Sequence, residues 1–277
     1  LVERVQADLL CGGSAYGLDA ASGVMRYLEE QKQGFRTPAG VVPIVPAAVI
    51  YDLEVGNCKV RPDAKMGYAA CMSSSAEPPS QGNVGAGAGA SVGKLLGMKY
   101  ATKSGIGTAS MKTKGGLIVG VMIVVNAFGD VLDLESRNIL AGLRRPIKHG
   151  DPHDTPYADT FAVMQSLIGR TILKTARGAN TVIGVIATNA KMSKDEANKI
   201  AQMGQNGLAL TINPAHTMFD GDTLFCLATG EKKSDVNLVG ALAAQVTARA
   251  INNAVLHAET AGGIPSSIYS RQDLNNQ

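Results

Sequence analysis

Two apolar runs constrain the fold of this chain most strongly. They cover residues 116–126 and 182–187, and continuous runs of this kind are typical of buried strands. The second run begins directly after a small, polar segment that ends at Asn180-Thr181. Thr181 could simply start the strand, because threonine is common in strands, or it could be a nucleophile that self-cleavage unmasks. The junction alone leaves both alternatives open.

The length and composition limit the class of protein. With 277 residues, 45% of them hydrophobic, the chain can form one large domain or two small ones. Its 32 glycines indicate close backbone packing and many tight turns. A net charge of +3, spread over scattered basic residues, does not indicate nucleic-acid binding. No uninterrupted apolar stretch is long enough for a membrane span, and no signal peptide is visible, although the chain begins at Leu1.

The cysteines and histidines predict neither a disulfide framework nor a metal site. They lack CxxC and HExxH spacings. They are Cys11, Cys58, Cys71, Cys226, His149, His153, His216 and His257. We therefore expect a reduced, cytoplasmic protein without a metal or other cofactor.

The remaining pattern predicts alternating strands and helices. Helices are expected over residues 18–30, 158–167 and 235–259, and further strands over 41–53 and 222–228. Pro43 and Pro46 make the first half of the 41–53 strand irregular or an edge. Ser193 and Glu196 form a capping box at the start of another helix. Residues 145–180 are polar and contain three prolines, so they are the best candidate linker. The imperfect alternation indicates α/β or α+β layers without a parallel Rossmann order.

Two helices have an apolar face that we expect to be buried. The expected inward residues are Leu18, Ala21, Val24, Met25 and Leu28 in the first helix and Leu238, Leu242, Val246, Ile251 and Val255 in the last.

Residues 85–94 form a glycine-rich segment that ends in Lys94. A phosphate-binding loop of the Walker type would need glycine in place of Ala88 and Ser or Thr in place of Leu95. A dinucleotide-binding loop would follow a strand, whereas this segment follows a loop, so nucleotide binding is not expected. Two interpretations remain: tight backbone packing against another layer, or backbone N–H groups that line a site beside a partly buried lysine.

Two carboxylates, Asp220 and Asp222, stand two residues apart just before a predicted strand. In an extended segment both side chains would lie on one face, where they could shift each other's pKa, bind a cation or orient an amine. The alternative is a solvated Asp-Gly turn that caps the strand. An EF-hand is excluded, because the further ligands and the terminal Glu are absent.

Asn126 and Tyr51 each end an apolar run. Asn126 could be a turn residue or a donor to an oxyanion. Tyr51 could be an ordinary strand-end tyrosine or part of a site. There is no GxSxG elbow, which argues against an α/β-hydrolase triad.

Six ordered segments together resemble one family, the self-processing L-aminopeptidase/D-esterase family of N-terminal-nucleophile hydrolases, and within it the nylon-oligomer (6-aminohexanoate-oligomer) endo-hydrolase branch. These segments are residues 11–21, 48–52, 85–94, 124–126, 180–189 and 219–225. The resemblance runs from about residue 9 to residue 258, and family members usually carry a further N-terminal segment.

The resemblance implies a four-layer αββα sandwich, an α/β (α+β) fold of the N-terminal-nucleophile type. It implies one domain over residues 1–277 that is cut between Asn180 and Thr181. The products would be a large (α) subunit, residues 1–180, and a small (β) subunit, residues 181–277. These subunits would stay together, often as a homo-oligomer, a tetramer of αβ pairs.

The resemblance also implies the site residues. Thr181 falls on the family's nucleophile. The other active-site positions of the nylon-hydrolase branch fall on Tyr51, Lys94, Asn126, Asp220 and Asp222. The aminopeptidase branch has Ser-Gly-Glu where this chain has Asp220-Gly221-Asp222, which argues against a simple aminopeptidase activity.

The implied chemistry is hydrolysis of linear amides by the freed Thr181. Threonine needs a base, and the α-amine exposed by cleavage has an unperturbed pKa of about 7.7–8.0. Asn126 could donate to the oxyanion, Lys94 could balance the charges of Asp220 and Asp222, and these carboxylates could orient the amine. The predicted substrates are amide oligomers such as those of 6-aminohexanoate. Aminopeptidase or D-amidase activity, an ornithine acetyltransferase-like transferase and a non-enzymatic scaffold remain alternatives.

Overall fold

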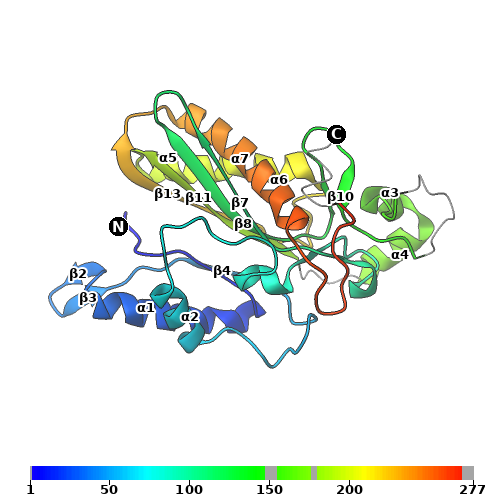
Figure 1. Cartoon of the computed structure of the whole chain (residues 1–277), viewed down its shortest axis with the longest axis horizontal. Coiled ribbons are helices and arrows are strands. Elements are labelled where there is room, and N and C mark those ends of the chain that lie inside the picture. Colours follow the sequence, from blue (N-terminus) through cyan, green and yellow to red (C-terminus); the bar gives the residue numbers. More distant parts are fainter. Residues whose placement is uncertain (1, 147–154, 176–179, 270–277) are drawn as a thin grey trace.

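The two predicted apolar strands lie side by side in the central sheet of the molecule (Figure 1). They are β8 (Ile118–Asn126) and β11 (Thr181–Ala190), which run antiparallel with Thr181 opposite Asn126. β7 (Ile106–Lys112) and β13 (Thr223–Lys232) complete the order β13-β11-β8-β7. The β11–β13 pair is parallel, so the sheet is mixed, as the absence of a Rossmann order predicted. The computed structural model describes residues 2–146, 155–175 and 180–269.

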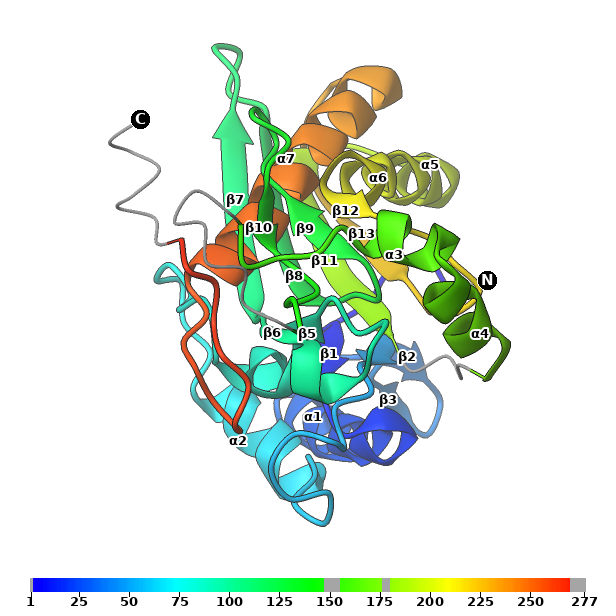
Figure 2. The same cartoon turned by 90° about the vertical axis from the view of Figure 1, so that its right-hand side faces the viewer.

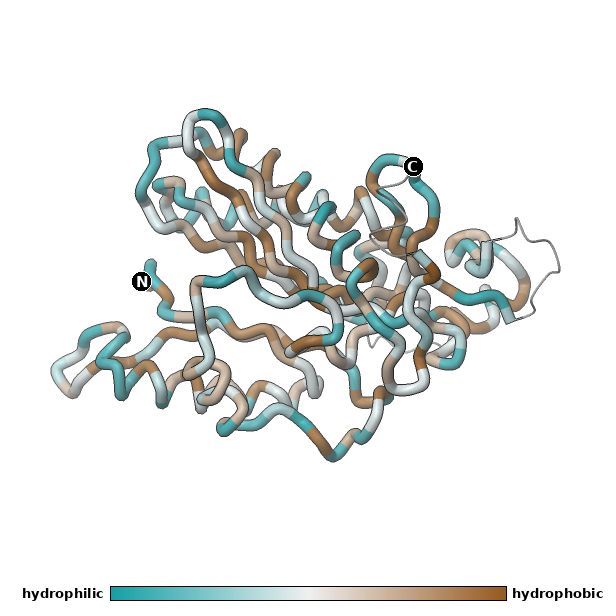
Figure 3. Tube along the Cα trace, viewed as in Figure 1, coloured by the Kyte–Doolittle hydropathy of each residue, from teal (hydrophilic) through white to brown (hydrophobic). Residues whose placement is uncertain are grey.

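Three helices cover one face of this sheet: α5 (Lys194–Gly204), α6 (Asn206–Thr211) and α7 (Val236–Leu256). The predicted capping box of α5 is confirmed, because Ser193 accepts from the backbone of Glu196 and Glu196 accepts from the backbone of Ser193. Between sheet and helices lies the largest apolar cluster, and Figure 3 shows how apolar residues concentrate along the central strands.

The opposite face is covered by a second, thinner pair of layers. β1 (Leu9–Cys11) runs parallel to β4 (Ala47–Val49), and α1 (Ala20–Glu30) and α2 (Ala64–Met72) pack outside them (Figure 1). α1 and α2 approach closely, because a Cβ on Gly23 would lie 1.8 Å from the carbonyl oxygen of Ala64. The order of helix, sheet, strand pair and helix is the predicted αββα sandwich of an α+β protein.

Shorter elements connect these layers. They are η1 (Ser14–Asp19), β2 (Phe35–Thr37), β3 (Gly40–Val42), η2 (Gly85–Gly89), β5 (Ser91–Val92), η3 (Met98–Tyr100), β6 (Thr102–Lys103), β9 (Asp130–Leu132), β10 (Ile139–Ala141), α3 (Thr160–Gln165), α4 (Leu167–Thr175) and β12 (Ile212–Asn213). β9, β10 and β12 form a three-stranded sheet. Figure 2 shows α3 and α4 as a separate pair beside the layers.

The irregular first half expected for the strand over 41–53 is confirmed, because β3 ends at Val42 and β4 begins only at Ala47, after Pro43 and Pro46. Two other expectations about elements were wrong. The helix expected over 158–167 is the shorter α3, and the following helix α4 was not predicted. In the described part of the predicted linker, Tyr157 is buried, so this part packs against the body of the protein. The rest of that segment, with the predicted loop histidines His149 and His153, lies outside the described residues.

The buried faces of two helices also differ from the prediction. Leu18 lies in the 3-10 helix η1, whose tighter turn changes the periodicity, and both Leu18 and Met25 are exposed. In α7 the buried seam is built largely from small residues such as Gly240 and Ala243, while Leu238 is exposed. The prediction gave weight to large apolar residues and missed this seam.

Candidate active site

The Asn180–Thr181 junction lies at the start of β11, which is one of the two inner strands of the central sheet. The Thr181 Oγ1 donates to the carbonyl oxygen of Asn180 at 2.6 Å. The backbone N–H of Gly221 donates to the same oxygen at 2.9 Å. The Thr181 hydroxyl therefore lies beside the carbonyl group that it would attack, and a backbone donor already polarises that group.

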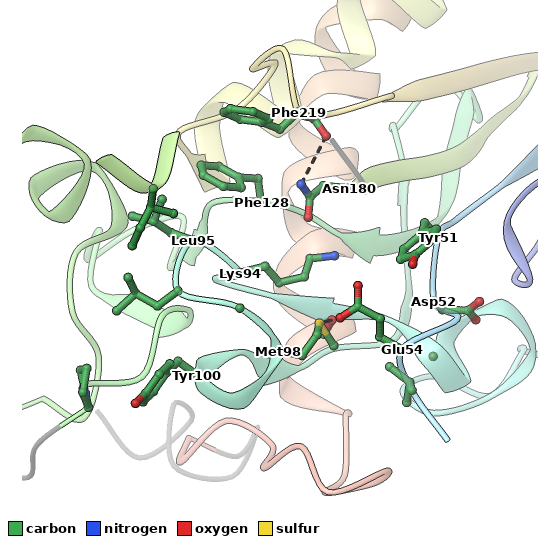
Figure 4. A pocket seen from close by; sticks show the side chains of 17 residues that line it. Tyr51, Asp52, Glu54, Lys94, Leu95, Met98, Tyr100, Phe128, Asn180 and Phe219 are labelled. Carbon is green, nitrogen blue, oxygen red and sulfur yellow. Dashed lines mark hydrogen bonds between the residues drawn. The ribbon is translucent and has the colours of Figure 1, made fainter. Parts of the chain in front are cut away.

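Asn180, the first residue of the junction, is held in place by hydrogen bonds. Asn180 is buried and forms an isolated bridge with Asp220. Its backbone N–H and its side-chain Nδ2 both donate to the carbonyl oxygen of Phe219, at 3.2 and 3.3 Å (Figure 4). These contacts fix the acyl side of the Asn180–Thr181 bond.

Asp222 lies beside the first residues of β11. Its Oδ1 accepts from the backbone N–H of Val182 at 2.9 Å, and its Oδ2 lies 3.1 Å from the Nδ1 of His216. Burial raises the pKa of the Asp222 carboxyl, and the nearby charge of Asp220 adds to this, while the Val182 and His216 contacts oppose it. His216 is a contact of the site that the sequence did not predict.

Asp220 has a different environment from Asp222. Its Oδ1 accepts from the backbone N–H of Phe128, and its Oδ2 accepts from the backbone and hydroxyl of Thr217. The backbone N–H of Asp220 also donates to the carbonyl oxygen of Thr217. A turn before β13 thus ends at Asp220, whose parallel bridge with Asn180 leads the chain on toward β13.

Lys94 and Asn126 form the other side of the site. The Lys94 Nζ donates to the Oδ1 of Asn126 at 2.8 Å and to its backbone oxygen at 3.1 Å. The Asn126 Nδ2 donates to the backbone oxygen of Tyr51 at 3.0 Å. Since Asn126 is paired with Thr181 across the ladder, these contacts place Lys94 one residue away from the candidate nucleophile.

Burial lowers the pKa of Lys94 to about 7, although the nearby charges of Asp220, Glu54 and Asp52 act in the opposite direction. The predicted charge balance against the two carboxylates is therefore not a direct ion pair: the ammonium group contacts Asn126. An amine with this pKa exchanges a proton near neutral pH.

The glycine-rich segment is tightly packed. A Cβ on Gly87 would lie 2.4 Å from the carbonyl oxygen of Gly82, and one on Gly89 would lie 2.2 Å from the Asp52 carboxylate. The buried Lys103, which the sequence did not single out, donates to the carbonyl oxygens of Gly87 and Ala90 at 2.9 Å each. This geometry agrees with the packing interpretation and positions Lys94 at the end of the segment.

A cavity of about 550 Å³ adjoins the junction (Figure 4). Tyr51, Lys94 and Asn180 line it, together with two acidic residues, Asp52 and Glu54. The apolar part of the lining includes Leu95, Leu96, Met98, Tyr100, Phe128 and Phe219. A partly apolar, concave pocket with a few polar groups is typical of a small-molecule site.

The structure brings all the predicted site residues to one place, where β8 ends and β11 begins.

Among the described residues, no three His, Cys, Asp or Glu side chains are grouped so that they could hold a metal ion. Within the same part of the chain, no helix has the length and apolarity needed to cross a membrane. Sequence reasoning missed Gly221, whose role depends on its backbone, and Glu54, which stands two residues after Asp52.

The fold is that of the N-terminal-nucleophile (Ntn) hydrolase class. The L-aminopeptidase D-Ala-esterase/amidase of Ochrobactrum anthropi, described as a variant of the Ntn hydrolase fold, shares the fold with a TM-score of 0.61 at 16% identity, over 93% of this chain and 69% of that one. The β-aminopeptidase of a Burkholderia species matches with a TM-score of 0.59 at 19% identity, over 93% and 70%.

The chain belongs to peptidase family S58, which it matches over residues 2–268. It is 42% identical to an uncharacterised aminopeptidase of Mycobacterium leprae, over 96% of this chain and 75% of that protein. It is 32% identical to the 6-aminohexanoate-oligomer endohydrolase of a Kocuria species, over 81% of this chain and 61% of the relative. The protein is thus a hydrolase of peptide or amide bonds.

Proposed function

We propose that the chain cuts itself between Asn180 and Thr181 and that the freed Thr181 is the nucleophile of an amide hydrolase. One observation carries this proposal: the Thr181 hydroxyl and the Gly221 N–H converge on the carbonyl oxygen of Asn180, at 2.6 and 2.9 Å.

In the proposed self-cleavage, the Thr181 Oγ1 attacks the carbonyl carbon of Asn180 and gives up its proton to a base. The C–N bond breaks, the Asn180 acyl group passes to the hydroxyl oxygen as an ester, and the amine takes up a proton. Water then hydrolyses the ester. Neutral Lys94 is our candidate base for the first step, because burial lowers its pKa to about 7 and its partner Asn126 is paired with Thr181.

After the cut, the α-amine of Thr181 becomes the base. An unperturbed α-amine has a pKa of about 7.7–8.0, so part of it is neutral near pH 7. The carboxylate of Asp222, which already contacts the backbone of Val182, is well placed to orient this amine. A substrate carbonyl would occupy the position of the Asn180 carbonyl, where the Gly221 N–H would stabilise the oxyanion.

The proposed substrates are linear amide oligomers of aminoalkanoate character. Support comes from the 6-aminohexanoate-oligomer endohydrolase relatives and from the apolar lining of the cavity. A second candidate is aminopeptidase activity, which the more similar mycobacterial relatives favour by name. Rates on 6-aminohexanoate oligomers and on short L-peptides separate the two, and an acetyl-ornithine assay tests the transferase alternative. The four free cysteines support the proposed reducing, cytoplasmic compartment.

Intact-mass spectrometry of the purified protein tests the self-cleavage. We expect two chains that separate before Thr181 in the wild type and a single chain in Thr181→Ala. Thr181→Ser keeps a hydroxyl and should still cut. A Thr181→Ala protein that is cut at this bond and still hydrolyses amides would refute the proposal.

A further inference from the structure

The cavity beside the junction lies on the acyl side of the bond that we propose is cut. Asn180, which supplies the carbonyl group, lines it. A substrate that replaces Asn180 on the nucleophile would therefore extend its acyl chain into this cavity. Whatever the cavity recognises is then a property of the acyl part of the substrate.

The two carboxylates on the cavity wall differ in what they already bind. The Oδ1 of Asp52 accepts from the backbone N–H of Gly13 at 2.7 Å. Its Oδ2 is enclosed by glycines, since a Cβ on Gly12 would lie 2.4 Å from it and a Cβ on Gly89 would lie 2.2 Å from it. The Asp52 carboxylate is therefore already packed between its own segment, the Gly12-Gly13 turn and Gly89, and is not free to bind a ligand.

Glu54, by contrast, is free to bind a ligand. Its side chain is exposed, and within the described residues it accepts no hydrogen bond and makes no ion pair. Figure 4 shows its carboxylate turned into the cavity, toward the side on which Lys94 and Met98 lie. Lys94 does not neutralise it directly, because the Nζ of Lys94 donates to both oxygens of Asn126.

The surroundings of Glu54 suit an alkyl chain with a cationic end. The same cavity is lined by Leu95, Leu96 and Met98, which offer apolar surface to methylene groups. An unpaired carboxylate on the wall of a partly apolar cavity attracts an ammonium group, and a charge contact of this kind discriminates between charged and neutral ligands. Lys94 would repel such a group only in its protonated form, and its pKa is lowered to about 7.

We propose that Glu54 binds the free ammonium group of the substrate's acyl chain, so that the enzyme selects acyl groups that carry a primary amine at the end of a flexible alkyl chain. This inference rests on the proposed function. It adds a binding residue and a charge requirement that hold for the acyl side of the substrate only.

The test uses three anilides that differ only at the end of the acyl chain: 6-aminohexanoyl, hexanoyl and N-acetyl-6-aminohexanoyl 4-nitroanilide. For Glu54→Gln we expect kcat/KM on the aminohexanoyl substrate to fall about tenfold relative to the hexanoyl substrate, mainly through KM. A fourth, anionic substrate, adipoyl mono-4-nitroanilide, is added for Glu54→Lys, which should reverse the preference toward it. Glu29→Gln, which removes an exposed carboxylate on α1, is the matched control.

A second readout does not need turnover. Calorimetry on the self-cleaved wild type should show that 6-aminohexanoate, the free acyl product, binds more tightly than hexanoate, and the Glu54→Gln substitution should remove the difference. Equal losses on all three anilides, or no change in their ratio, would overturn the role of Glu54. A wild-type protein that neither cuts itself nor hydrolyses any amide would instead refute the proposed function. The difference in affinity between the amine-bearing and the amine-free ligand would still report on Glu54.

Discussion

Gly221 contributes to the site through its backbone and not through a side chain. Its N–H donates to the carbonyl oxygen of Asn180, and a Cβ at this position would lie 3.4 Å from the Thr181 Oγ1, an ordinary contact distance. Alanine should therefore fit and keep the donor, whereas proline has no N–H. Comparing the two substitutions therefore distinguishes the loss of the N–H donor from the effect of added side-chain atoms.

We predict that Gly221→Pro slows self-cleavage by about 10²–10³, the cost of one lost oxyanion donor. Gly221→Ala should slow it by less than tenfold. The rates are followed by denaturing gel on precursor purified at low pH, with thermal unfolding as the check that both variants fold. Equal rates for the two variants would show that the hydrogen bond from Gly221 does not matter.

Lys94 gives a pH dependence with a definite sign. Burial lowers its pKa to about 7, so the amine becomes able to accept a proton as the pH rises through 7. We expect the wild-type self-cleavage rate to rise over this range and then level off. Lys94→Arg, which stays charged, and Lys94→Met, which has no amine, should both be slow and lack this rise.

Exposed Lys65→Met serves as the control for a lost positive charge. A Lys94→Arg protein with the wild-type pH profile would show that another group is the base.

Folding stability offers a second check on the pKa of Lys94. Because its pKa is lowered in the fold, the unfolded chain binds more protons between pH 7 and about 10.4, so this lysine makes stability rise with pH in that window.

The sequence predicted the side chains of the site better than its backbone. Thr181 and Asn126 stand at the ends of apolar runs. Lys94 ends the glycine-rich segment, Asp222 belongs to a pair of carboxylates before a predicted strand, and the resemblance assigned all four to one site. Gly221 carries no side chain, so its N–H could be placed only once the turn before β13 was known.

At the scale of elements, long apolar runs were predicted well and seams of small residues were not. β7 was missed, since Gly107 and the polar residues Thr108 and Ser110 break its apolar pattern. The structure explains the glycine: a Cβ on Gly107 would lie 2.0 Å from the carbonyl oxygen of Ala250, in α7. The helix therefore packs directly on the backbone of the strand.

This contact predicts that Gly107→Ala destabilises the protein by about 1–3 kcal/mol, because helix backbone cannot yield as a side chain can. Gly120→Ala on the neighbouring strand β8 is the matched control, since the nearest atom to its Cβ would be 3.8 Å away. It should change the free energy of unfolding by less than about 1 kcal/mol. Urea denaturation measures both, and similar losses would mean that the contact with α7 is not the cause.

At the scale of the whole molecule, the position of the proposed cut decides what happens to the two products. β11 would become the first strand of the small product, yet it pairs with β8 of the large product from Thr181–Asn126 to Thr188–Val119. α7, also in the small product, packs on β7 and β8. The cut removes one peptide bond at a strand end and leaves the sheet and its core in place.

We therefore predict that residues 1–180 and 181–277 co-elute in native gel filtration and separate only in denaturant. The uncut Thr181→Ala protein should elute at the same volume, because cutting does not change the shape of the pair. Light scattering on the same column tests the proposed tetramer, which would weigh about four times the 28.7 kDa of one chain. Separation of the products without denaturant would contradict the argument, since a buried central strand cannot leave the sheet while the core stays intact.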